Sequence, residues 1–296
     1  MFKYRMKMRK DKAVYNWING FVLLTAVFLF FQDYAGKWNL FKGKDAVSLT
    51  SLLMSVVLAH MIKAGRLYLT LYGTEIRWKT YLKVYCKVTP VSVLFPLKTG
   101  EFFRMYCYGK QLGNNLKGII IVLLDRFMDT LALVTMILGV CVVSGGQVSS
   151  VMYALILLLM CLLAGYYVFP GMYAFWKHFL MSAKATEKRI ALLKFLEASH
   201  AVYTEISNVT KGRGIMLYLL SVAAWGIELG SVVLISGHSS VYYSGVISQY
   251  LSAALGIGRS DELKQFVFCS VILLIIVYTG IKSGERKKTD KERIEK

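Results

Sequence analysis

Long apolar runs separated by short polar segments make up most of this chain. A helix needs about 20 mainly apolar residues to cross the hydrocarbon core of a membrane. Runs close to that length occur at residues 15–31, 46–72, 117–143, 151–169, 214–236 and 263–281. The pattern therefore predicts an all-α, polytopic membrane helix bundle with about six crossings, formed as one transmembrane domain by residues 15–282.

Residues 88–112 are hydrophobic but too interrupted for a span. Prolines, a glycine and charged residues break the run at Pro90, Pro96, Gly100, Glu101 and Arg104. Non-helical backbone at membrane depth is tolerated only when it is buried in protein or lines a cavity. We therefore expect a re-entrant helical hairpin that enters and leaves on one face, with its tip surrounded by the other helices.

The cationic residues are concentrated between the apolar runs. The net charge of +19 would suggest nucleic acid in a soluble chain, but this distribution is typical of cytoplasmic loops that meet anionic headgroups, so no nucleic-acid partner is expected. The main basic segments are 1–14, 75–87, a loop at about 172–213 and a tail at 283–296. With six crossings, all of these basic segments lie on the same face of the membrane. The chain is thus predicted to be a multi-pass protein of the cell membrane with both termini cytoplasmic.

The remaining polar connections are expected on the outer face. The turn 144–150 carries no charge, and the stretch 237–262 has a net charge of −1. Residues 241–254 in that stretch are apolar enough to dip into the membrane. They could form a second hairpin, so the prediction is one or two re-entrant hairpins.

Ionisable residues at membrane depth are the first candidates for a functional site, because they are costly there and usually face a protein interior or a cavity. Asp125 lies about 12 Å along a helix from Lys117, near the middle of a hydrocarbon core about 30 Å thick. Asp125 and Asp129 share a helix face, and Arg126 can reach Asp129. Such carboxylates need basic partners. Arg126 is the nearest candidate, followed by Arg104 if the hairpin packs against this helix.

The hairpin and the second apolar run add further charged residues. Glu101 and Arg104 are three residues apart and can pair on a helix, and the planar fork of an arginine can hold a phosphate through two hydrogen bonds. In the second run, His60, Lys63 and Arg66 follow one side of a helix. The simplest interpretation is that Lys63 and Arg66 snorkel to the cytoplasmic surface and that His60 is a packing residue. The alternative adds His60 and Arg66 to the site.

Two interpretations of this charged set remain open. One is a structural ion network that fixes the register of the helices. The other is a hydrophilic path for a polar or phosphate-bearing headgroup. The predicted substrate-binding residues are His60, Arg66, Glu101, Arg104, Asp125, Arg126, Asp129 and Glu228.

Three motifs resemble a known family. They are P-x3-G-E-x2-R at 96–104, D-R-x2-D at 125–129, and W-x2-E at Trp225 and Glu228. They resemble the lysylphosphatidylglycerol synthase transmembrane family, also called the flippase-like integral membrane family, over roughly residues 46–281. The resemblance implies a bundle with re-entrant hairpins that moves or presents lipid headgroups, including lipids of cell-envelope glycan pathways. A soluble aminoacyl-transferring domain is absent from these residues, so lysyl transfer is not expected.

The leading hypothesis is a flippase-like protein without chemistry of its own. It predicts a phospholipid or lipid-linked glycan as ligand, envelope-biosynthesis enzymes as partners, no cofactor and no metal, and it is compatible with a homo-oligomer. One alternative is a membrane-embedded enzyme acting on a lipid-linked phosphate, with Asp125, Asp129 or Glu101 as general base or metal ligand. The other is a scaffold for a glycan-synthesis complex.

Overall fold

The computed structural model describes residues 2–35, 38–74, 76–144, 150–182, 186–236, 240–256 and 258–294. Over these residues the chain is helical, with no strand. The elements are α1 (Phe2–Tyr34), η1 (Trp38–Phe41), α2 (Ala46–Thr70), α3 (Trp78–Leu94), η2 (Pro96–Lys98), α4 (Gly100–Leu112), α5 (Asn115–Ser144), α6 (Ser150–Met181), α7 (Glu187–Thr210), α8 (Gly214–Ser236), α9 (Ser240–Ala254) and α10 (Asp261–Ile294).

Six of the described helices contain segments long and apolar enough to cross a membrane. These segments have 21 to 30 residues, at or above the length that a hydrocarbon core requires. They are Val14–Tyr34, Ala46–Thr70, Asn115–Val143, Met152–Met181, Gly214–Leu234 and Asp261–Gly284. The predicted polytopic helix bundle is confirmed.

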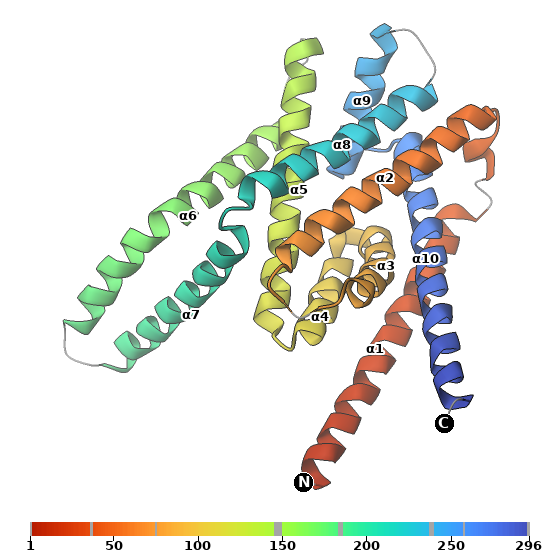
Figure 1. The fold of residues 1–296 in the computed structure, drawn as a ribbon. Coiled ribbons are helices and arrows are strands. Elements are labelled where there is room, and N and C mark those ends of the chain that lie inside the picture. Colours follow the sequence, from red (N-terminus) through yellow and green to blue (C-terminus); the bar gives the residue numbers. More distant parts are fainter. Residues whose placement is uncertain are drawn as a thin grey trace.

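The fourth span is longer than predicted. The sequence pattern ended it at Phe169, before Pro170, but α6 continues through Pro170 to Met181. A proline removes one backbone hydrogen bond from a helix, and here the apolar run resumes beyond it, so the helix remains the favoured way to satisfy the backbone in lipid. The following polar segment is not an open loop either, because most of it forms α7. Helices α6 and α7 extend side by side away from the rest of the bundle (Figure 1).

The predicted hairpin corresponds to two helices joined by a short turn, α3, η2 and α4, whereas its re-entry into the membrane remains a prediction. Phe95 precedes Pro96 and has an extended conformation, with φ −73° and ψ 132°, because a proline disfavours the helical conformation of the residue before it. This ends α3, and α4 begins at Gly100. Gly100 is needed for close packing of the two arms, since a methyl carbon there would lie 2.6 Å from Ser92 Cα. The hairpin starts at Trp78, earlier than the predicted residue 88.

A tight turn joins the hairpin to α5. Gly113 ends α4 in the left-handed region, with φ 66°, which glycine adopts without steric cost. The side chain of Asn114 then caps α5 by accepting the backbone N–H of Lys117 at 3.2 Å. Gly118 lies against the backbone of Gly109 across the turn. This close contact fixes the hairpin against the helix that carries Asp125.

The arms of the hairpin pack on neighbouring helices, but its tip is not surrounded by them as predicted, because Pro96, Lys98 and Thr99 are exposed. Helices α2 and α8 pack along one another, α4 packs on α5, and α10 covers α3 (Figure 1). Buried side chains from the hairpin, α5 and α10 form one core cluster that includes Tyr81, Val88, Tyr108, Ile121 and Val271. The hairpin tip is thereby held next to the middle of α2 and α5.

Residues 240–254 form a single helix, α9, instead of a second hairpin. Its buried residues Val246, Tyr250 and Leu251 pack against Ala132 of α5 and Trp225 of α8. A straight helix suffices because it buries one apolar face on two neighbours. The turn 144–150, which was predicted on the outer face, lies mostly outside the described residues, as does the start of the stretch 237–262.

The predicted orientation can be tested on the described surface. In Figure 1 the chain ends marked N and C lie toward the bottom of the view, and α9 lies toward the top. Cysteines introduced at exposed Lys188 and Arg259, in a background without native cysteines, are expected to react with impermeant thiol reagents from opposite sides of the membrane, Lys188 from the cytoplasm. Labelling of both from one side would overturn the six-crossing topology.

Candidate functional site

Two carboxylates project from the middle of α5. Asp125 and Asp129 lie one turn apart, and Asp125 is only 3% exposed. Apart from Arg126 and Thr130, the neighbouring residues of the helix are apolar, so the helix itself offers these carboxylates few hydrogen-bond donors. A buried carboxylate is costly unless it is paired. The structure supplies the partners from α2, α4 and α8.

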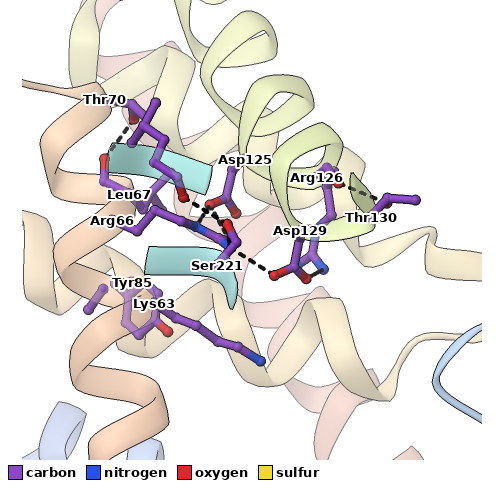
Figure 2. Close-up of polar contacts among 12 residues, drawn as sticks. Lys63, Arg66, Leu67, Thr70, Tyr85, Asp125, Arg126, Asp129, Thr130 and Ser221 are labelled. Carbon is purple, nitrogen blue, oxygen red and sulfur yellow. Dashed lines mark hydrogen bonds and ion pairs between the residues drawn. The ribbon is translucent and has the colours of Figure 1, made fainter. Parts of the chain in front are cut away.

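Arg66 of α2 is the central partner of both carboxylates. Its Nη2 and Nε lie 2.6 Å and 3.0 Å from Asp125 Oδ1, and its Nη1 donates to Asp129 Oδ1 at 2.8 Å. Nη1 also donates to Ser221 Oγ of α8 at 2.6 Å. Figure 2 shows the Arg66 side chain directed toward these three groups. The prediction that Arg66 snorkels to the surface is wrong, because its donors find acceptors inside the bundle.

The hairpin supplies a second arginine to Asp125. Arg104 Nη2 lies 2.7 Å from Asp125 Oδ2, the carboxylate oxygen that Arg66 leaves free. Both guanidinium groups are buried with the carboxylate between them. The prediction that Arg104 pairs with this helix is confirmed. The prediction that Arg126 is the nearest partner of the carboxylates is wrong for Asp125, because Arg126 points about 100° away around the helix.

Arg126 instead joins α5 to the hairpin tip. Its Nη2 lies 2.8 Å from Glu101 Oε1 and 3.3 Å from Ser92 Oγ, and its Nη1 is 3.8 Å from Asp129 Oδ2. Ser92 donates to Glu101 Oε1 at 2.8 Å, and Arg104 Nη1 is 3.5 Å from Glu101 Oε2. The two predicted pairs within single helices are therefore present but long. The short contacts connect different helices.

A second charged pair joins α2 to α8. Lys63 forms an ion pair with Glu228, and the hydroxyl of Tyr250 on α9 donates to Glu228 Oε2 at 3.1 Å. The Lys63 ammonium also lies 5.4 Å from the centre of the Trp225 ring, within the range of a cation–π interaction. Lys63 therefore does not follow the prediction that it snorkels to the surface, because Glu228 and Trp225 provide partners in the interior.

His60 has one bonded ring nitrogen and one without a partner. Its Nδ1 lies 3.0 Å from the hydroxyl of Tyr85 on α3. Its Nε2 is buried and has no hydrogen-bond partner among the described residues. The ring lines the cavity next to the ion network. The packing interpretation of His60 accounts for only the first of these nitrogens.

All eight predicted site residues line one cavity of about 310 Å³. Helices α2, α3, α4, α5, α8, α9 and α10 contribute to its walls. Their role in binding a substrate remains a prediction. Sequence reasoning missed Ser92, Ser221 and Tyr250. The spacing of Ser221 before Trp225 and Glu228 places the three on one helix face and could have revealed it, whereas the sequence around Tyr250 gives no comparable signal.

Comparison with known families agrees with the cavity-lining motifs. The family described as the lysylphosphatidylglycerol synthase TM region matches residues 17–246. The chain belongs to this family. No curated protein and no solved structure gives a match. This member of the lysylphosphatidylglycerol synthase transmembrane family is thus a multi-pass integral membrane protein of a lipid-related family.

The family match includes all eight predicted site residues, which lie between His60 and Glu228. It stops before α10, although α10 contributes Phe266, Ser270 and Leu274 to the cavity wall. In this family member the ion network is therefore part of the shared region. One wall of the cavity comes from a helix beyond that region.

Proposed function

We propose that this protein moves or presents the headgroup of a phospholipid or lipid-linked glycan across the cell membrane, in the synthesis of envelope lipids or glycans. The hairpin α3–α4 re-enters the membrane on one face and brings its arginine to the cavity. Membership of a lipid-related family supports this assignment. The main support for it is that the cavity wall has buried hydrogen-bond donors without acceptors.

The cavity wall has buried donors without acceptors. Among the described residues, seven buried side-chain polar atoms have no hydrogen-bond partner, and five of them belong to residues that line this cavity. Arg104 Nε, Arg126 Nε and Trp225 Nε1 can only donate, whereas His60 Nε2 and Ser270 Oγ can do either. Leaving a buried donor unsatisfied costs about 1–3 kcal/mol. A ligand rich in acceptor oxygens, such as a phosphodiester with hydroxyl groups, would satisfy them.

The charge of the cavity favours a ligand with one negative charge. Five cationic residues line it against four carboxylates, which leaves one excess positive charge. Lys98 at the hairpin tip is exposed and is the lining cation for which the described residues provide no carboxylate within ion-pair distance. A phosphodiester headgroup carries a single negative charge, so it would neutralise the cavity.

The carboxylates are arranged to hold partners rather than to react. Asp125 is bonded to two arginines, and Asp129 contacts Arg66 and Arg126. Glu228 is likewise held by Lys63 and Tyr250. A general base must reach a substrate proton with a free lone pair in suitable geometry. The engaged carboxylates therefore favour binding and transport over the membrane-embedded enzyme.

Replacing Arg104 by lysine tests this proposal. Lysine keeps the charge that Asp125 requires but loses the planar fork and the unpartnered Nε. We expect headgroup movement to fall at least about tenfold, the equivalent of one lost interaction of about 1.4 kcal/mol, while the variant still folds. The measurement is movement of fluorescent phosphatidylglycerol and of a polyprenyl-linked sugar between the leaflets of liposomes that contain the purified protein.

Arg259→Lys is the matched control for this variant, because Arg259 is exposed and lies outside the cavity. It should transport lipid at the wild-type rate. Wild-type transport by Arg104→Lys would remove Arg104 as a headgroup contact. Failure of the wild-type protein to move any of the lipids offered would argue against the transport function itself.

A further inference from the structure

A second hollow lies on the opposite side of the hairpin tip from the polar cavity. It has a volume of about 320 Å³ and runs between α1 and α4. Its walls include Ile18 and Val22 of α1 and the aromatic residues Phe102, Phe103 and Tyr106 of α4. These side chains are almost entirely apolar. The groove therefore suits hydrocarbon and offers little to a polar ligand.

Neighbouring residues at the hairpin tip line the cavity and the groove in turn. Lys98, Glu101 and Arg104 recur every three residues and line the polar cavity, whereas Phe102 and Tyr106 line the groove. The first turns of α4 are therefore amphipathic, with an ionic face and an aromatic face.

Phe95 belongs to both walls, so the groove and the cavity meet where the chain turns from α3 into η2. The groove is also accessible from the side, because α1 packs loosely on the bundle. Only 6% of its span is buried, and Phe102 at the groove is 71% exposed. In a membrane such a surface faces the hydrocarbon of the bilayer. A lipid could thus enter sideways with its chain in one hollow and its headgroup in the other.

We infer that the groove between α1 and α4 binds an acyl chain of the phospholipid whose monoanionic headgroup occupies the polar cavity. The inference rests on the proposed function, since it needs a headgroup in the cavity. It assigns α1 and the aromatic face of α4 a role in binding the lipid. The hairpin tip then lies between the headgroup and the tail.

A bulky side chain in the groove tests the inference. Val22→Trp should fill the groove and displace several methylene groups of the bound chain, each of which contributes to affinity through burial. We expect the affinity for phosphatidylglycerol in mixed micelles to fall about tenfold or more. The affinity for its deacylated headgroup, glycerophosphoglycerol, should stay unchanged. Both are measured by calorimetry on the full-length protein.

Leu24→Trp is the matched control, because Leu24 lies on α1 but is 72% exposed and does not line the groove. It should leave both affinities unchanged. Equal phosphatidylglycerol affinity for Val22→Trp and wild type would overturn the tail site while leaving the headgroup site intact. Wild-type protein that binds neither compound would overturn both the proposed function and this inference.

Photocrosslinking gives a second measurement that needs no variant. Wild-type protein is irradiated with phosphatidylglycerol that carries a diazirine on its acyl chain, and the labelled peptides are identified by mass spectrometry. We expect label on the residues around Val22 and Tyr106, and competition by excess unlabelled phosphatidylglycerol. Uniform labelling around the bundle without competition would show ordinary bilayer lipid and overturn the inference.

Discussion

Asp125→Asn is expected to destabilise the folded protein by about 3–5 kcal/mol, the usual cost of removing one member of a buried ion pair. The substitution keeps the size of the side chain but leaves Arg66 and Arg104 without the carboxylate that lies between them. Both arginines are buried, so water cannot readily replace it. Thermal unfolding in detergent micelles can be followed with a thiol-reactive dye, since Cys86 and Cys107 are buried in the folded protein.

Asp261→Asn is the control for this measurement. Asp261 pairs with Lys264 on the surface, and 70% of its side chain is exposed. Exposed ion pairs contribute about 0–1 kcal/mol, so the midpoint of unfolding should hardly change. If Asp125→Asn unfolded at the same temperature as the wild type, the network would not hold α2, α4 and α5 together.

Gly100→Ala is expected to disturb the hairpin and with it the cavity. The added methyl carbon would lie 2.5 Å from the backbone oxygen of Val91 and 2.6 Å from Ser92 Cα, so the two arms must move apart. Overpacking of this kind typically costs about 1–3 kcal/mol. Because Ser92 and Glu101 share a hydrogen bond across the arms, we expect headgroup affinity to fall about tenfold or more as well.

Gly139→Ala is the matched substitution elsewhere in the bundle. Gly139 lies in the interior of α5, and no atom would lie within 4 Å of an added methyl group. Alanine is the better helix former by about 1 kcal/mol, so this variant should be as stable as the wild type or slightly more stable. Similar behaviour of the two glycine variants in unfolding and in headgroup binding would contradict a tightly packed hairpin.

The sequence predicted the charged residues of the site but not how they pair. The helical period placed Asp125 and Asp129 on a common face. The free-energy cost of exposing a charged side chain to hydrocarbon indicated that both carboxylates face the protein interior. The partner from α2 could not be deduced, because the register between two helices depends on packing that a single sequence does not display. Arg66 therefore looked like a terminal cation that snorkels. It is instead the residue with bonds to both carboxylates.

The fold, too, was predicted only in part from the sequence. Apolar length identified the six spans, since the bilayer imposes that length on every crossing helix. Prolines were a less reliable guide to where the helices end. Pro96 ends α3 as expected, but α3 continues through Pro90, which was predicted to interrupt it, and α6 continues through Pro170. A charged hairpin tip comes after Pro96, whereas another apolar run comes after Pro170, and there the hydrocarbon environment favours a continuous helix.

The covering of α3 by α10 has a consequence for biogenesis. The hairpin lacks a span of its own and carries charged residues that are costly in lipid, so it needs surrounding protein before it can settle at depth. Val271 and Leu274 in the core around α3 belong to α10, which is synthesised well after the hairpin. Helices α1 and α2 can enter the membrane as soon as they are made. The proposed lipid site is instead completed only after translation has passed Leu274.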